Sequence, residues 1–247
     1  MNNKNYFAAK IQDLIRREEN GEGMVFSNFL TAEEGAEAAA ICKKAGASFV
    51  LYGGYPESER KMLAVSSLDE ENLLACFPIV LLRLSGGDLS AVSHRDVLGA
   101  LMGTGIRREL LGDIIVRDGK AVFFAAEHIK QFLIQNVTSV GRQNVTLEEA
   151  PLSFEIPKPH FEELRLTVAS LRADAVVGGL CHCSREQANR LIDGKFVSVN
   201  HVLLEKKTKE IHAGDCVVVR GSGKWIVDQC GDLTKKGRAV LLCRKYN

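Results

Sequence analysis

The chain has 247 residues, of which 46% are hydrophobic and 26% are charged. This balance is typical of a folded globular protein and excludes disordered and collagen-like chains, and the length accommodates two or three small domains. Apolar runs such as FPIVLL at 77–82 are as short as strands, well below the roughly 18 residues of a membrane helix. The first residues lack a secretory signal, and seven cysteines follow no framework spacing. We therefore expect reduced thiols, a cytoplasmic location and no membrane partner.

The net charge of +1 hides an uneven distribution. Residues 160–247 contain 15 Lys and Arg against 10 Asp and Glu, a net +5, whereas residues 1–159 contain 17 against 21, a net −4. Basic charge gathered in one terminal region favours a polyanionic partner for that region.

Residues 1–74 predict a small N-terminal α/β domain made of two helices and then short strands. Thr31 and Glu34 have the spacing of a capping box before the second helix, and Gly46 follows where that helix would end. The segments 47–55 and 60–67 are typical of two strands around a polar turn. We find no catalytic constellation in this domain.

Residues 75–150 predict a middle domain of the ferredoxin-like or RNA-recognition type. Its segments alternate in the order β-α-β-β-α-β, with Asp118-Gly119 as a tight hairpin turn and the last strand expected within 138–149. The third strand lacks the aromatic signature with which RNA-recognition motifs stack bases. If this domain touches RNA, we therefore expect its loops to make the contact.

Pro151, Pro157 and Pro159 mark a stiff linker over residues 151–160. Beyond it, residues 161–247 predict a compact α+β domain with one strand, two short helices and then further strands. The fold class that we expect for the whole chain is α+β.

The stretch CHCSREQANRLIDGKFVSVN, at 181–200, begins with three soft metal ligands, Cys181, His182 and Cys183. Zinc sites usually repeat a C-x-x-C pair, but here the pair is C-x-C and no second pair follows. Cys216 and Cys243 lie in apolar, strand-like sequence where cysteine acts as a small hydrophobe. We therefore predict no metal and no cofactor.

The same stretch also predicts a helix with a basic face. Ser184 and Gln187 form a capping box, and we expect Gly194 to be the C′ residue after the helix. Arg185 near the helix start could meet a phosphate together with free backbone N–H groups. An amphipathic helix with a merely solvated polar face explains the local pattern equally well.

Three segments, LRADAVV (171–177), SREQANRLIDGKFVSVN (184–200) and AGDCVVVRGSGK (213–224), resemble the RNA-binding domain named after small-subunit ribosomal protein four, the S-four domain. The resemblance implies that a helix pair and adjoining strands present basic residues to structured RNA. Family members usually have Arg-Leu-Asp before the first helix, whereas Ala173 replaces the leucine here. The implied RNA contacts are Arg172, Arg185, Arg190, Lys195, Lys206, Lys207, Arg220 and Lys224, with Asp174 and Ser184 orienting the arginines and the local backbone.

The segment SHRDVLGALMGTGIRRELLGDIIV (93–116), ahead of an S-four domain, is similar to the YlmH family. Membership implies a bacterial ribosome-associated RNA-binding protein that binds rRNA and tRNA on the large ribosomal subunit carrying peptidyl-tRNA. It also implies assistance in quality control of stalled translation, together with other quality-control factors. A link to cell division is attached to the family, and nothing in the residues explains it physically.

The sequence predicts no enzyme and no small-molecule substrate. The HRD triplet at 94–96 lacks the downstream Asn and glycine-rich loop of a kinase, and GSGK at 221–224 is too short for a phosphate-binding loop. The alternatives are an RNA-modifying enzyme, of the pseudouridine synthase or methyltransferase kind, and a division-linked adaptor. Possible additional RNA contacts in the middle domain are His94, Arg95, Arg107 and Arg108.

Overall fold

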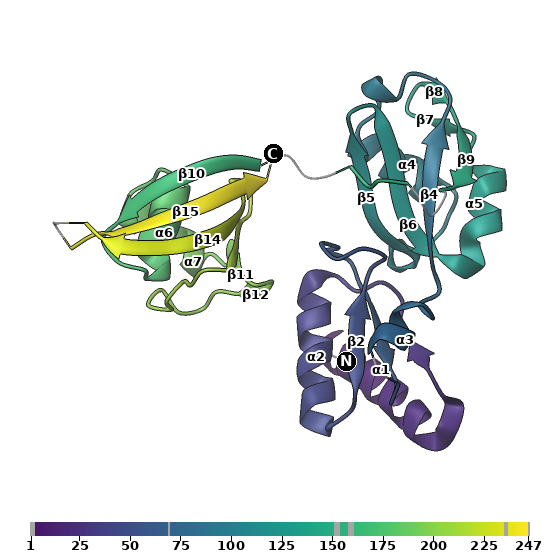
Figure 1. Ribbon diagram of the computed structural model, residues 1–247, viewed down its shortest axis with the longest axis horizontal. Helices are drawn as coiled ribbons and strands as arrows, with labels where there is room; N and C mark the ends of the chain where they lie inside the picture. Colours follow the sequence, from purple (N-terminus) through teal and green to yellow (C-terminus); the bar gives the residue numbers. More distant parts are fainter. Residues whose placement is uncertain (1–2, 69, 151–153, 158–160, 235–236, 247) are drawn as a thin grey trace. The chain divides into compact units, whose positions relative to one another are not determined.

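The computed structural model describes residues 3–68, 70–150, 154–157, 161–234 and 237–246. The chain forms two compact units, an N-terminal unit of residues 1–157 and a C-terminal unit of residues 158–247 (Figure 1). The fold is α+β with antiparallel sheets, as the sequence predicts. Among the described residues, no helix is both long and apolar enough to span a bilayer.

The first part of the N-terminal unit packs two helices against a three-stranded antiparallel sheet of order β1-β3-β2. The expected capping box of Thr31 and Glu34 is present, and Gly46 ends α2 in the left-handed conformation. The short strand β1 and the short helix α3 were not expected. The elements are α1 (Asn3–Arg17), a π-helical turn (Glu18–Glu22), β1 (Val25–Phe26), α2 (Ala32–Ala45), β2 (Phe49–Tyr52), β3 (Met62–Val65) and α3 (Glu70–Leu74).

The second part of this unit has the expected β-α-β-β-α-β order, in a four-stranded antiparallel sheet arranged β5-β6-β4-β9. The last predicted strand is divided: a small hairpin, β7 (Ser139–Val140) and β8 (Gln143–Asn144), precedes the strand that joins the sheet. Asp118 and Gly119 both have positive φ, as the expected hairpin turn requires. The main elements are β4 (Ile79–Ser85), α4 (His94–Gly103), β5 (Leu111–Arg117), β6 (Lys120–Ala126), α5 (Lys130–Asn136) and β9 (Thr146–Glu149).

One hydrophobic core joins the two parts of the N-terminal unit. Phe29 lies so close to Gly112 that a Cβ there would come within 2.8 Å of its ring, and Tyr55 stacks on Phe124 at 5.2 Å. Asp113 accepts hydrogen bonds from the Tyr55 hydroxyl and from the backbone of residues 59 and 60. Both faces of the second sheet are consequently covered.

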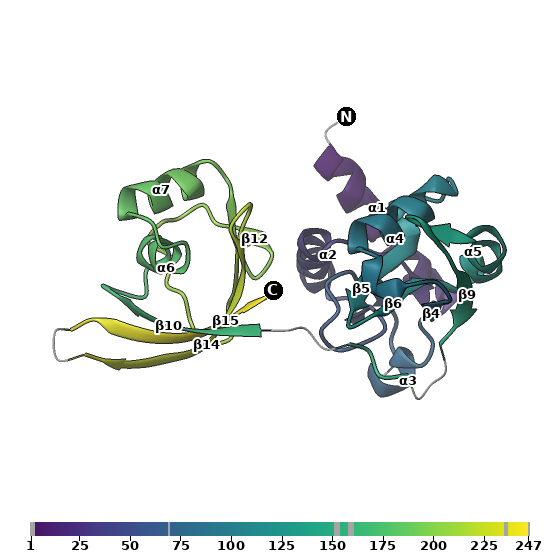
Figure 2. The same cartoon turned by 90° about the horizontal axis from the view of Figure 1, so that it is seen from above.

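The C-terminal unit is a curved six-stranded antiparallel sheet of order β10-β15-β14-β13-β11-β12, with two helices on one face (Figure 2). Register places Leu166, Trp225 and Leu241 on the face that packs against the helices. The opposite, outer face carries the alternate residues of each strand. The elements are β10 (Phe161–Val168), α6 (Ala173–Leu180), α7 (Arg185–Asp193), β11 (Val197–Val199), β12 (Val202–Leu203), β13 (Cys216–Val219), β14 (Gly223–Leu233) and β15 (Ala239–Tyr246).

The linker that the prolines predict over 151–160 lies partly outside the described residues, which omit 151–153 and 158–160. Within the described part, Phe154 and Ile156 pack against the core of the N-terminal unit. The chain therefore remains attached to that unit at these two side chains.

Candidate nucleic-acid interface

The CHC triplet forms the turn between helices α6 and α7. His182 has φ 50°, the left-handed conformation of a residue just beyond a helix end. The Cys183 N–H donates to the Gly178 carbonyl at 2.9 Å and the His182 N–H to the Gly179 carbonyl at 3.3 Å, the pair of bonds that defines a Schellman motif. Ser184 then caps α7 as expected, with the reciprocal bond to Gln187.

A buried carboxylate orients two arginines at the start of both helices. Asp174 is 2% exposed, and its Oδ2 accepts from Arg185 Nε at 2.9 Å and Nη2 at 2.8 Å. Arg172 donates Nε to Oδ1 at 3.2 Å and Nη2 to Oδ2 at 3.1 Å. The Arg172 and Arg185 side chains remain 40% and 57% exposed. Their planar guanidinium groups are held in place while part of each faces solvent, so the cluster can present donors to an anion.

The environment of Asp174 keeps its carboxyl ionised. Burial acts to raise the pKa of Asp174, but hydrogen bonds and charges from Arg172 and Arg185 oppose it and prevail, so that the pKa lies below its ordinary value. Two cations and one anion leave the cluster with a net charge of about +1, because arginine is always protonated. The cluster is therefore both a fixed structural element and a cationic surface.

The N-terminus of α6 is already occupied by backbone from the same unit. The Ala173 N–H donates to the Lys209 carbonyl at 2.8 Å, and the Asp174 N–H donates to the Lys207 carbonyl at 3.1 Å. These bonds hold the loop of residues 205–210 beside the arginine cluster. Lys207 itself reaches Asp193 near the end of α7, with Nζ to Oδ2 at 2.7 Å. An anion would accordingly meet side chains here rather than the N–H groups of α6.

Helix α7 ends one residue later than the sequence suggested. Gly194 has φ −74° and is the C-cap, while Lys195 is the left-handed residue at φ 60°. The bonds Lys195 N–H to Ile192 O and Phe196 N–H to Leu191 O, both 3.0 Å, complete a second Schellman motif. The expectation that Gly194 occupies C′ is thus wrong. Glycine at 194 instead leaves room for the Phe196 ring, because a Cβ there would lie 2.7 Å from it.

The remaining predicted contacts of this unit do not form one cluster. Arg190 lies on the exposed side of α7, where it pairs with Glu186 at 2.9 Å. Lys206 is exposed in the loop beside α6. Arg220 follows β13 and lies 6.0 Å from the Phe196 ring. Lys224 lies on the outer face of the sheet, 4.3 Å from the Tyr246 ring, away from the face that packs against the helices.

The four candidate residues of the middle region differ in their environments. Arg95 is exposed, and Arg107 is exposed and paired with Glu109 at 2.9 Å. Arg108 is partly buried, and its Nη1 donates to the carbonyls of residues 111 and 112. Burial lowers the pKa of Arg108 to about 10, with Arg60 contributing. Burial, helped by Arg108, also lowers the pKa of His94, so its imidazole is neutral at pH 7 and adds no charge.

The middle sheet carries its two adjacent phenylalanines, Phe123 and Phe124, in the core rather than on the surface. They are 0% and 3% exposed on β6. Strand β6 therefore offers neither of these rings to a base, in keeping with the missing aromatic signature.

Nothing in the described part of the chain resembles a metal site: no group of three or more His, Cys, Asp or Glu side chains is placed to hold an ion. Cys243 is buried in the core of the C-terminal unit, and burial raises the pKa of its thiol to about 11. Burial likewise raises the pKa of Cys181.

Two comparisons with known proteins show what the chain is similar to. A family model described as "Putative RNA-binding domain in YlmH" matches residues 77–154. The chain is also 29% identical over 219 residues to the Bacillus subtilis (strain 168) protein named "Ribosome-associated protein quality control protein P2", covering 87% of this chain and 84% of that protein. The chain is thus similar to the YlmH family, by a domain model over residues 77–154 and by a relative over most of its length.

A solved structure supports the same fold. The cell division protein ylmH from Streptococcus pneumoniae superposes with a TM-score of 0.56 at 20% identity, covering 64% of this chain and 97% of that chain. At this identity the likeness concerns the α+β fold alone.

The YlmH model covers a region whose charge is balanced. Residues 77–154 contain eight Lys and Arg and eight Asp and Glu, a net charge of zero, whereas residues 160–247 have a net +5. Phosphate attraction in this chain is therefore stronger in the C-terminal unit. Phe196 was not among the predicted contacts, although an aromatic residue directly after a basic helix end is a signal that the sequence contains.

Proposed function

We propose that this chain is a non-catalytic RNA-binding protein that acts on the ribosome in the cytoplasm. Its targets are rRNA and tRNA on the large subunit carrying peptidyl-tRNA, and it assists quality control of stalled translation, together with other quality-control factors. The name of the Bacillus subtilis relative supports the ribosomal part of the proposal. The description of the family model supports the RNA-binding part.

The observation that carries the proposal is the arginine pair around Asp174. Two guanidinium groups from two helix starts converge on this buried aspartate, and both remain partly exposed. Preorganised arginines lose little side-chain freedom when they contact phosphate. Lys206 and Lys195 extend positive charge on either side along the chain.

Binding of this kind rests on phosphate contacts and on RNA shape. Each phosphate neutralised by a cation releases a counterion, which makes affinity fall with salt. A-form helices are read mainly through backbone and 2′-hydroxyl contacts. The exposed residues Arg95 and Arg107 add a second set of contacts from the region that the YlmH model covers.

The test is co-sedimentation of the purified protein with separated ribosomal subunits over a range of salt concentrations. The parent protein is expected to pellet with large subunits, more strongly when they carry peptidyl-tRNA. Arg185→Ala is expected to weaken binding by about 1–3 kcal/mol, or about 5- to 150-fold, and to reduce the salt slope by about one unit.

Arg165→Ala is the matched control, because Arg165 is an exposed arginine on the outer face of β10. It removes the same charge without touching the Asp174 cluster, so its binding should stay close to that of the parent. If both variants lost the same affinity for ribosomal subunits, the loss would come from net charge alone, and the cluster would be rejected as the site.

The non-catalytic part of the proposal has its own measurement. Ribosomal RNA and tRNA incubated with the protein are digested and analysed for modified nucleosides. We expect no pseudouridine or methylated nucleoside beyond the untreated control. A modification that depends on the protein would instead support the RNA-modifying alternative.

A further inference from the structure

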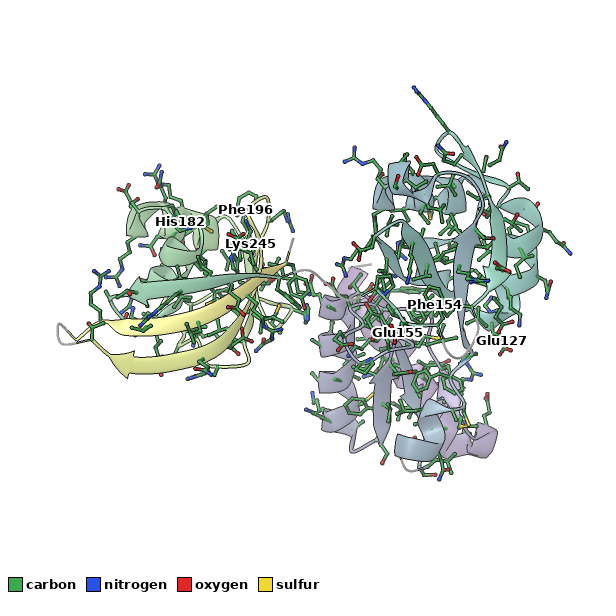
Figure 3. All side chains as sticks on the ribbon, turned by 45° about the horizontal axis from the view of Figure 1, so that its top comes forward. Glu127, Phe154, Glu155, His182, Phe196 and Lys245 are labelled. Atoms are coloured by element: carbon green, nitrogen blue, oxygen red, sulfur yellow. The ribbon has the colours of Figure 1, made fainter. Side chains whose placement is uncertain are left out.

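Phe196 is an aromatic side chain that the fold leaves at the surface. It is 43% exposed, directly after the left-handed Lys195 that ends α7. Figure 3 shows it at the surface of the C-terminal unit. The hydrophobic residue in this position of a Schellman motif normally packs back onto the last helical turn, yet nearly half of this side chain stays open to solvent.

The backbone and one neighbour fix where the ring lies. The Phe196 N–H donates to Leu191 O, and the Phe196 carbonyl accepts from the Arg220 N–H at 2.9 Å. The ring lies where a Cβ of Gly194 would be, within 2.7–2.8 Å of that position. The ring is thus set against a bare stretch of backbone.

Arg220 lies across from this ring without being committed to a carboxylate. Its guanidinium carbon is 6.0 Å from the ring centroid, the outer limit of a cation–π contact. Among the described residues, no carboxylate lies within ion-pair distance of Arg220. The side chain is exposed, so small changes in its torsion angles can widen the space above the ring.

A second aromatic–arginine pair in the same unit shows the contrast. Arg244 lies 4.6 Å from the Phe161 ring, and Asp228 holds its guanidinium by Nε at 2.9 Å and Nη2 at 2.7 Å. That arginine is locked over its ring by two short bonds. The Phe196–Arg220 pair has the same chemistry, but a longer separation and no lock.

We propose that Phe196 and Arg220 form a stacking site for one unpaired base of the RNA, and this proposal rests on the proposed RNA-binding function. A base stacks on an aromatic face or on a guanidinium plane, and such contacts are made with bases that have left the duplex. Lys195 adds a cation for the adjoining phosphate. The RNA class is therefore a duplex next to a bulge, loop or single-stranded end.

The experiment compares two RNAs with the same number of phosphates, one a continuous duplex and one a duplex interrupted by unpaired nucleotides. Phe196→Leu keeps an apolar contact with the helix end but removes the aromatic face. It is expected to weaken binding of the interrupted RNA by about 5- to 150-fold and to leave duplex affinity within about twofold. Because no charge changes, the salt slope should be unchanged. Phe196→Trp should bind the interrupted RNA at least as well as the parent.

Two further variants make the result specific. Arg220→Lys keeps the charge but lacks the plane, so it should lose affinity selectively for the interrupted RNA. It also serves as the test if Phe196→Leu lowers the melting temperature too far. Phe161→Leu removes the locked aromatic pair and should bind both RNAs like the parent.

The outcomes separate this proposal from the one on which it rests. If the parent binds neither RNA nor ribosomal subunits, the RNA-binding function fails and the stacking site fails with it. If the parent binds both RNAs but folded Phe196→Leu and Arg220→Lys lose nothing, or lose equally on both, only the stacking site is wrong. Loss of ribosome binding in Phe196→Leu with unchanged affinity for both RNAs would assign the ring to a protein contact and also overturn the stacking site.

Discussion

His182 and Lys195 each hold left-handed backbone at the end of a helix, with φ of 50° and 60°. Glycine is the usual residue at this position because it has no Cβ to clash with the neighbouring carbonyl. Any other L-residue there raises the free energy of the folded state by about 1 kcal/mol. The chain therefore keeps an imidazole and an ammonium group at two points where glycine would make the fold more stable.

Lys195→Gly is expected to raise the free energy of unfolding by about 0.5–1 kcal/mol, because the left-handed conformation no longer strains a side chain. The same substitution should weaken binding to ribosomal particles, since it removes a cation beside the proposed stacking site. Urea unfolding and co-sedimentation measure the two effects separately. Lys195→Ala is the control: it should lose the binding contribution without gaining stability, and a stability gain equal to that of glycine would contradict the strain argument.

Single residues were predictable from the sequence where a local rule governs them. The capping pairs Thr31–Glu34, Ser93–Asp96 and Ser184–Gln187 are present in the structure, because a cap depends only on residues three apart. The partner of Arg185 was not predictable in this way. Asp174 lies 11 positions earlier and meets Arg185 only when α6 and α7 pack together.

At the scale of elements, Asp174 joins the starts of α6 and α7. Its carboxylate accepts hydrogen bonds from Arg172 at one helix start and from Arg185 at the other. Removing its charge leaves the two guanidinium groups close together without the anion that they share. Asp174→Asn is expected to lower the free energy of unfolding by about 1–3 kcal/mol at pH 7. This is less than for a fully buried pair, because both arginines are partly exposed to solvent.

The stability difference between the parent and Asp174→Asn should depend on pH. The folded-state pKa of Asp174 is below its ordinary value of 3.8, so the stability contributed by the carboxylate is fully present above about pH 4. It is lost as the pH falls from there through the lower folded-state pKa. Free energies of unfolding can be measured at intervals of about one pH unit between pH 2 and pH 6. The values for the parent and for Asp174→Asn should converge at the acid end. A constant difference across this range would show that Asp174 is not ionised as described.

In the N-terminal unit, Asp113 performs a comparable linking role between the β2–β3 loop and β5. It accepts from the Tyr55 hydroxyl at 2.9 Å and from the Glu59 and Arg60 N–H groups at 2.7 and 3.0 Å. Asp113→Ala should leave these donors without an acceptor and lower the free energy of unfolding by about 2–3 kcal/mol. Thermal melting measures the change. The partly exposed Glu148→Gln, which only weakens an ion pair with Arg83, should stay within about 0.5 kcal/mol of the parent.

The elements themselves were predictable in proportion to their length. Alternation identified β10, a strand-length apolar run identified β4, and the Asp118-Gly119 turn between two apolar segments identified β5 and β6. Strands of two residues, such as β1, β7 and β12, carry no period to detect and form only because a partner strand is already in place. The strand expected within 138–149 is divided into the β7–β8 hairpin and β9 for the same reason, because its two-residue strands carry no period.

For the whole molecule, the two compact units meet in sequence near residues 157 and 158. We expect limited proteolysis to cut within 151–160 and to release a C-terminal fragment that folds alone, since its core is formed from its own residues. That fragment should retain most of the salt-dependent affinity for RNA, because it carries the net +5. Melting and RNA binding of both purified fragments test this. Affinity residing wholly in the N-terminal fragment would move the site to the region that the YlmH model covers.

The shared core of the N-terminal unit also affects folding during translation. Phe29, Met62 and Leu73 are buried together with residues of β5 and β6, and those strands follow Leu73 by some tens of residues. At about 5–20 residues per second, translation delivers the last of them about 2–10 s after Leu73. During that interval the early helices and β1–β3 expose an apolar surface that only later synthesis can cover. A pause in translation between residues 74 and 120 would therefore leave an aggregation-prone nascent chain that depends on chaperones.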